Sequence, residues 1–134
     1  MRNVVLADTG PLYAASDPDD SRHGRSLEEQ ERLEAEGLEM VVSYATLQES
    51  YNLILRKLGL SQTRAFLEDL ARTAIFVTPT EDDYRGAIRR VLRYSDQDIS
   101  LADALLAEVS HRLEAPVWTY DHHFDVMGAR VWRP

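Results

Sequence analysis

Two aspartates follow short apolar runs near the two ends of the chain and are candidates for shared chemistry. Asp8 directly follows the run 3–7, and Asp121 comes after the run 116–119. If both runs are strands of one parallel sheet, their carboxyl ends meet at the same edge, where open α/β sheets bind ligands. We therefore expect the two aspartates to meet in one crevice, although a turn or helix-capping role would explain either alone.

Two further carboxylates lie on predicted helices and can face the same crevice. Glu49 is opposite the apolar stripe of its helix, with Ala45 and Leu53 one turn away, so both a cleft wall and a solvated surface fit it. Asp103 is at the N3 position after Ser100, which is a capping-box pattern. Capping and ligand binding are compatible, because a helix that begins at the crevice presents its N3 side chain there.

Four converging carboxylates need a cation, because otherwise they repel one another and some stay protonated at neutral pH. The chain has no cysteine, so the available metal ligands are oxygen and imidazole. Oxygen ligands favour hard ions such as Mg²⁺ or Mn²⁺, which hold phosphate and activate water. Phosphodiester hydrolysis is the reaction that this set suits best, and we expect activated water to attack without a general-base side chain.

Three arginines recur every four residues along one predicted helix and are candidates for gripping phosphate groups. They are Arg85, Arg89 and Arg93. The alternative is a solvated helix face on which these arginines pair with Glu81 and Asp82.

The histidines beside Asp121 also have two interpretations. His122 and His123 are either imidazole ligands or, as adjacent loop histidines more often are, polar surface residues. The acidic run 28–36 reads as a solvated helix face.

Short apolar strands that alternate with helices must position these side chains. Strands are expected at 3–7, 38–42, 74–78 and 116–119, with 129–133 as a candidate fifth at the edge. A helix is expected to begin at the Thr-Gly-Pro after Asp8, and others at 21–37, 44–59, 61–72, 80–94 and 100–114. This alternation predicts a parallel sheet covered on both faces.

Length and composition favour one globular domain over residues 1–134. The chain is 44% apolar and 28% charged, and it contains neither a membrane-length apolar window nor a signal-peptide core, so we expect a cytoplasmic protein without a membrane partner. The net charge of -8 argues against wrapping nucleic acid by bulk electrostatics. It does not exclude a nuclease whose carboxylates are neutralised by cations.

Four segments in order resemble the PIN-domain family, especially single-domain ribonuclease toxins of VapC type. The segments are VVLADTGPLYA, SYATLQES, SLADALLAE and VWTYDHHFD. The resemblance covers essentially the whole chain, including DPDDSRHGRSLE after the first segment. It implies a three-layer α/β/α fold with a central parallel sheet of four to five strands, and metal-dependent endoribonuclease activity with one or two Mg²⁺ or Mn²⁺ ions.

The resemblance also assigns residues to roles. The catalytic and metal-binding quartet would be Asp8, Glu49, Asp103 and Asp121. Thr9 and Thr119 are where the family often has a hydroxyl that orients a carboxylate or water, and Asp125 is either an outer carboxylate or a surface residue. Phe124 is expected to be a packing anchor rather than a catalytic group.

The resemblance further implies an RNA substrate, a homodimer and a cognate antitoxin. A housekeeping RNA-processing nuclease and a catalytically silent binding module remain alternatives, although an intact quartet favours activity. A response-regulator receiver domain is disfavoured because no lysine follows Lys57. A haloacid-dehalogenase phosphatase is disfavoured because Gly10 occupies the place of its second aspartate.

Overall fold

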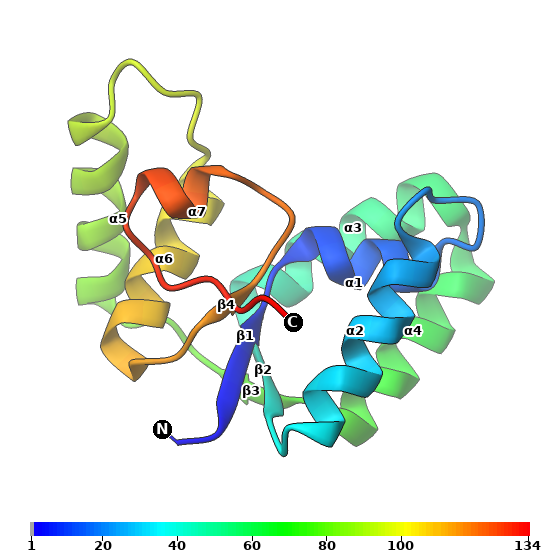
Figure 1. Cartoon of the computed structure of the whole chain (residues 1–134). Helices are drawn as coiled ribbons and strands as arrows, with labels where there is room; N and C mark the ends of the chain where they lie inside the picture. The colour runs from blue at the N-terminus through cyan, green and yellow to red at the C-terminus, as the bar shows by residue number, and fades with distance from the viewer. Residues whose placement is uncertain (1) are drawn as a thin grey trace.

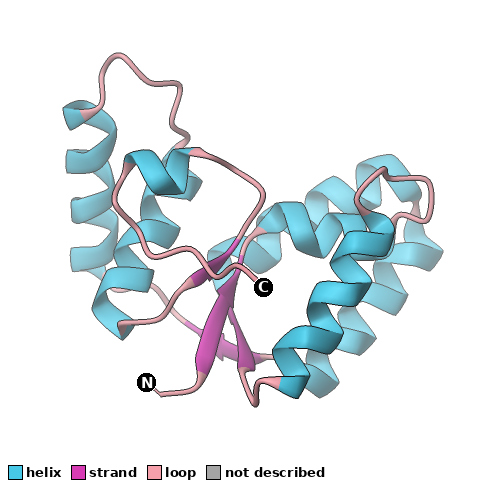
Figure 2. Ribbon diagram, viewed as in Figure 1, coloured by secondary structure: helices cyan, strands magenta, loops and turns pink. Residues whose placement is uncertain are grey.

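The computed structural model describes residues 2–134 and contains a four-stranded parallel sheet between two groups of helices (Figures 1 and 2). The strands are β1 (Val4–Ala7), β2 (Glu39–Ser43), β3 (Ile75–Val77) and β4 (Val117–Trp118). Their order across the sheet is β3-β2-β1-β4, so β1 is internal and β4 lies beside it. The predicted α/β fold with a central parallel sheet is therefore confirmed.

Two sets of helices cover the two faces of the sheet (Figure 1). One face is covered by α1 (Thr9–Ser16), α2 (His23–Ala35), α3 (Tyr44–Leu58) and α4 (Leu60–Thr73). The other is covered by α5 (Glu81–Arg93), α6 (Leu101–Leu113) and α7 (His123–Val126). Over residues 2–134, none of these helices has both the length and the apolar character needed to cross a bilayer.

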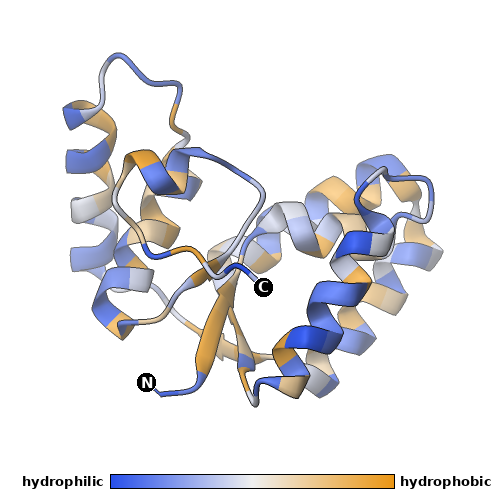
Figure 3. Cartoon of the chain, in the orientation of Figure 1, coloured by the Kyte–Doolittle hydropathy of each residue, from blue (hydrophilic) through white to orange (hydrophobic). Residues whose placement is uncertain are grey.

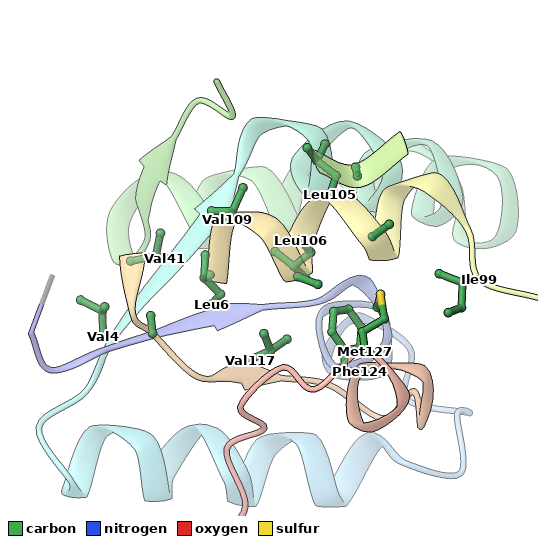
Figure 4. Close-up of a cluster of buried hydrophobic side chains, with 14 residues drawn as sticks. Val4, Leu6, Val41, Ile99, Leu105, Leu106, Val109, Val117, Phe124 and Met127 are labelled. Atoms are coloured by element: carbon green, nitrogen blue, oxygen red, sulfur yellow. The ribbon is translucent and has the colours of Figure 1, made fainter. Parts of the chain in front are cut away.

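β1 divides the hydrophobic core into two clusters because successive side chains of a strand point to opposite faces. Val4 and Leu6 point toward α5 and α6, whereas Val5 and Ala7 point toward the first four helices. In Figure 4 the first cluster includes Val41, Leu105, Leu106, Val109, Val117, Phe124 and Met127. The second cluster includes Leu12, Leu33, Val42, Ile54, Phe66, Leu70 and Trp118. Figure 3 shows the contrast between the apolar β1 and the largely hydrophilic α2.

The fifth strand expected at 129–133 does not form, and this prediction was wrong. Only Val131 pairs with the sheet, through an isolated parallel bridge to Val117. The bridge cannot grow into a ladder because β4 has only two residues before the chain leaves the sheet. The helix α7 was not predicted, since four residues are too few to show helical periodicity.

An ion pair between the buried Asp83 and the partly exposed Arg112 joins α5 to α6, the helix that carries Asp103. At the start of α5, the Asp83 carboxylate accepts from the Thr80 backbone amide, and the Thr80 hydroxyl accepts from the Asp83 amide, as the capping-box pattern predicts. Arg112 of α6 donates to the same carboxylate, with Nη2 2.9 Å from Oδ2. Although burial opposes ionisation, Arg112 and the Thr80 amide hold the pKa of Asp83 below its ordinary value.

Asp83→Asn is expected to lower the free energy of unfolding by about 2 kcal/mol at neutral pH, because a charge-assisted interaction is lost at a buried site. The lowered pKa means that this contribution is present above the ordinary aspartate pKa and disappears as the pH falls through the folded value. Urea denaturation at pH 7 and at acidic pH measures both effects. Asp82→Asn is the matched control, since exposed Asp82 lies in the same helical turn. An equal loss in both variants would contradict the prediction.

Candidate active site

The site lies where the order of strands reverses. From β1 the chain passes to β2 and β3 on one side, whereas β4 occupies the other side. β1 and β4 are parallel and paired, so the residues that follow them emerge at the same edge. Asp8 directly follows β1, and Thr119 directly follows β4. This is the position at which open α/β sheets bind ligands.

Asp8 is held rigidly by two hydrogen bonds. The Thr9 backbone amide donates to Asp8 Oδ1 at 2.8 Å, and the Thr119 hydroxyl donates to Oδ2 at 2.7 Å. Thr119 Oγ1 also accepts from the Asp121 backbone amide at 3.0 Å. One hydroxyl therefore fixes the positions of both aspartates, and Asp8 is only 7% exposed.

Glu49 is exposed on α3 and is tied to the end of β1 through Thr9. The Thr9 hydroxyl donates to Glu49 Oε1 at 2.5 Å. The buried Ser50 hydroxyl in turn donates to Thr9 Oγ1 at 3.2 Å. Thr9 thus orients a carboxylate, as the family resemblance implies. Sequence reasoning missed Ser50, because a serine beside a glutamate on a helix carries no distinguishing signal.

The backbone amide of Asp103 is capped by Ser100, while its carboxyl group lies in the pocket. The Ser100 hydroxyl accepts from the Asp103 amide at 3.0 Å, as expected for an N-cap. Asp83, at the same N3 position of α5, bonds back to the backbone of its N-cap residue, whereas the Asp103 carboxyl group lines the same pocket as Asp121.

The protonation of the cluster reflects burial and mutual repulsion. Burial, reinforced by the charges of Glu49 and Asp121, raises the pKa of Asp8 to about 6. Burial, followed by the charges of Asp8 and Asp121, raises the pKa of Asp103 to about 8. Although burial pushes the pKa of Asp121 upward, the His123 amide and the Asp103 proton hold it below its ordinary value. At neutral pH the cation-free cluster therefore retains a proton on the Asp103–Asp121 pair.

A shallow pocket of about 370 Å³ brings the four predicted carboxylates together. Its lining residues are Asp8, Thr9, Gly10, Arg22, Glu49, Asp103, Tyr120, Asp121 and His122. The donor set fits Mg²⁺ or Mn²⁺, because it offers carboxylate oxygens. A divalent cation would also offset the repulsion between carboxylates that helps to raise the pKa values of Asp8 and Asp103. Mg²⁺ usually retains several waters, which suits carboxylates spread around an open pocket.

The tightest group of potential metal ligands lies at one side of this pocket. Within residues 2–134, only Asp121, His122 and His123 bring three ligating atoms within 4.8 Å of one another. His122 is exposed, in agreement with the surface interpretation, but His123 is only 16% exposed and does not fit it. His123 Nδ1 lies 2.9 Å from Asp121 Oδ1 outside hydrogen-bonding geometry. Imidazole favours softer ions than the carboxylates do.

The remaining candidates lie outside the acidic pocket. Asp125 is exposed and pairs with Arg133 at 2.7 Å, so it occupies a surface position. Phe124 is fully buried, which confirms the expected packing role. Arg85 pairs with Glu81 at 2.9 Å, as the alternative of a solvated helix face predicts. Arg85, Arg89 and Arg93 are all absent from the lining of the acidic pocket.

Glu29 corrects the interpretation of 28–36 as a wholly solvated face. Glu29 is 6% exposed, and its Oε1 accepts from Trp118 Nε1 at 3.1 Å and from the Tyr120 hydroxyl at 2.6 Å. Burial, followed by the hydrogen bond to Glu29, raises the pKa of Tyr120, so its hydroxyl remains a donor. Glu29 shares the buried face of α2 with Ser26 and Leu33, but a sequence cannot reveal donors contributed by a distant strand.

The chain belongs to the PIN-domain family, because the model of the PIN domain matches residues 5–129. This match confirms the resemblance at family level, while a single domain over 1–134 stays a prediction. A search of curated proteins finds no match.

Solved structures show the same fold over nearly the whole chain. VapC20 of Mycobacterium tuberculosis, described as a sarcin–ricin loop cleaving toxin, has 22% identity and a TM-score of 0.83, covering 97% of this chain and 99% of its own. VapBC2 of Rickettsia felis, bound to a promoter DNA fragment, has 17% identity and a TM-score of 0.73. FitAcB of Neisseria gonorrhoeae has 18% identity and a TM-score of 0.69. Each of the last two covers 97% of both chains.

Proposed function

We propose that this chain is a Mg²⁺- or Mn²⁺-dependent endoribonuclease that acts as the toxin of a toxin–antitoxin pair. The observation that carries the proposal is the convergence of Asp8, Glu49, Asp103 and Asp121 from four separate segments on one open pocket. Membership of the PIN-domain family supports a nuclease, and the similarity to a toxin that cleaves the sarcin–ricin loop supports RNA as the substrate.

In this proposal the four carboxylates hold the cation, and two threonines hold the carboxylates. A bound Mg²⁺ or Mn²⁺ supplies charge neutralisation at the phosphodiester and activation of the attacking water. Thr119 fixes Asp8 and the backbone of Asp121, while Thr9 fixes Glu49. These bonds pre-organise the ligands, so little reorganisation is needed when the cation binds.

We further infer that the protein is cytoplasmic, binds a protein antitoxin and forms a homodimer. Similarity to the VapBC2 and FitAcB structures supports the antitoxin. An exposed apolar stripe on α5 supports the second copy: Tyr84, Ile88 and Leu92 recur every four residues and are 44%, 51% and 73% exposed. Burial of the same stripe on both copies would form a symmetric interface.

RNA cleavage is expected with Mg²⁺ or Mn²⁺ and to fall at least about 100-fold in EDTA, because the repelling carboxylates then lack their counter-charge. Labelled total RNA resolved on a denaturing gel measures the activity, and excess Mg²⁺ added after EDTA should restore it. Full cleavage in EDTA would contradict the metal-dependent mechanism.

Mapping of RNA ends after induced expression separates a toxin from a processing enzyme. A toxin should arrest growth, with cuts at a restricted set of sites that disappear when the antitoxin is co-expressed. Processing at the ends of stable RNA without growth arrest would favour the housekeeping alternative. Absence of any cut would favour a silent binding module.

A further inference from the structure

Arg22 places a guanidinium group at the rim of the acidic pocket. It is exposed at the start of α2, and it lines the pocket together with the four carboxylates. Its guanidinium carbon lies 5.3 Å from the centroid of the Tyr120 ring. Within residues 2–134, no carboxylate forms an ion pair with Arg22 at 4.0 Å or less. The charge of Arg22 is therefore available to an anion.

The neighbouring arginine is engaged in a different way. The Arg25 guanidinium lies 4.3 Å from the same ring centroid, and its Nε is 3.3 Å from Glu29 Oε2. The buried carboxylate of Glu29 thus compensates the charge of Arg25. Of the two arginines at the Tyr120 ring, Arg22 is the one without such a partner.

The Tyr120 ring is anchored through its hydroxyl, which bonds to the buried carboxylate of Glu29. Its hydroxyl donates to Glu29 Oε1 at 2.6 Å, and Trp118 Nε1 donates to the same oxygen at 3.1 Å. These bonds attach α2 to the segment that leads from β4 to Asp121. Because its hydroxyl is anchored in this way, the Tyr120 ring offers the Arg22 guanidinium a fixed aromatic face.

An RNA substrate needs a cationic contact at this place. A cation held by the carboxylates offsets the charge of the scissile phosphate, but neighbouring phosphates still approach an acidic pocket on a chain with a net charge of -8. Arginine suits phosphate because its planar fork donates two parallel hydrogen bonds. Resting on the proposed function, we propose that Arg22 binds an RNA phosphate next to the scissile one, and that Tyr120 and Glu29 are its positioning residues.

The contact predicts a specific change in RNA binding. In an Asp8→Asn background, in which loss of a proposed metal ligand is expected to prevent cleavage, Arg22→Ala should weaken the binding of a labelled single-stranded RNA about tenfold. The slope of log K against log salt should become shallower by about 0.7, the value for one phosphate contact on a single strand. Fluorescence anisotropy measures both quantities. Arg32→Ala, on the same helix and with the same change of charge, is the control and should leave both nearly unchanged.

Kinetics and a double-mutant cycle test the positioning role. In the active protein Arg22→Ala should raise KM about tenfold at nearly constant kcat, because the contact is the same in ground and transition states. Tyr120→Leu should reproduce much of this rise and be non-additive with Arg22→Ala, whereas Tyr120→Phe, which keeps the ring, should have less effect. Circular dichroism verifies that each variant is folded.

The outcomes separate this inference from the proposed function. If Arg22→Ala binds RNA like Arg32→Ala while the parent cleaves RNA, the Arg22 contact is wrong and the nuclease proposal stands. If Arg22→Ala and Tyr120→Leu are additive, Tyr120 does not position Arg22. If the parent protein neither binds nor cleaves RNA, both proposals are overturned.

Discussion

Asp103→Asn is expected to reduce RNA cleavage by about 100- to 1,000-fold while leaving the metal-free fold intact. The loss follows from the proposed role of Asp103 as a metal ligand in the carboxylate pocket. The fold should persist because asparagine removes a charge that burial and the neighbouring carboxylates disfavour, and because the backbone amide still reaches the Ser100 hydroxyl. Single-turnover cleavage and thermal unfolding in EDTA measure the two effects.

Ser100→Ala is the matched control, because it removes the helix cap and keeps the carboxylate. It should lower stability by about 1 kcal/mol and leave the cleavage rate close to that of the parent. If Asp103 is a metal ligand as well as an N3 residue, Asp103→Asn should therefore lose cleavage and keep stability, whereas Ser100→Ala should lose stability and keep cleavage. Wild-type turnover in Asp103→Asn would instead leave helix capping as the sufficient explanation of that aspartate.

The metal-free protein is expected to lose stability between about pH 5 and pH 8, and a divalent cation should restore it most strongly at pH 8. The pKa of Asp8 rises to about 6 and that of Asp103 to about 8, so the folded state binds these protons more tightly than the unfolded chain. Their contribution is present below the ordinary aspartate pKa and is lost as the pH rises through the folded values. The shift of Asp8 alone corresponds to a loss on the order of 3 kcal/mol.

Thermal unfolding with EDTA or Mg²⁺ at several pH values measures this linkage. At an Mg²⁺ concentration about 100 times Kd, the cation should add about 2.7 kcal/mol at pH 8 and much less at pH 5, where protons compete. Asp8→Asn removes one of the groups, so this variant should be more stable than the parent in EDTA at pH 8, and its pH dependence should be flatter. An equal Mg²⁺ effect at both pH values would argue against the carboxylate cluster as the binding site.

The strands that carry the site could be predicted because they are short apolar runs that end at Asp8 and near Asp121. Parallel strands end at a common edge, so two distant residues could be placed together without knowing the fold in detail. The capping patterns at Thr80 and Ser100 gave two helix starts for a similar local reason. Interactions that depend on neighbours in sequence are visible in the sequence itself.

Contacts that depend on orientation could not be predicted in the same way. Glu29 belongs to an acidic run, and only the rotation of α2 turns it toward Trp118 and Tyr120. Arg22 has no periodic partners, whereas the regular spacing of Arg85 and its companions attracts attention although Arg85 pairs with Glu81. The expected strand at 129–133 failed because its partner β4 is two residues long, which is a property of the sheet and not of the run.

The loop between α5 and α6 lies, in the sequence, between two pairs of the carboxylates that line the pocket. Asp8 and Glu49 precede this loop, Asp103 and Asp121 follow it, and its exposed residues include Ser95, Asp96 and Asp98. A single proteolytic cut there would leave each fragment with one carboxylate from a strand end and one from a helix. Neither half would hold the full set, so the proposed RNA cleavage would require the halves to reassociate, as in a split enzyme. The same loop is thus a natural point for dividing the protein into complementing pieces.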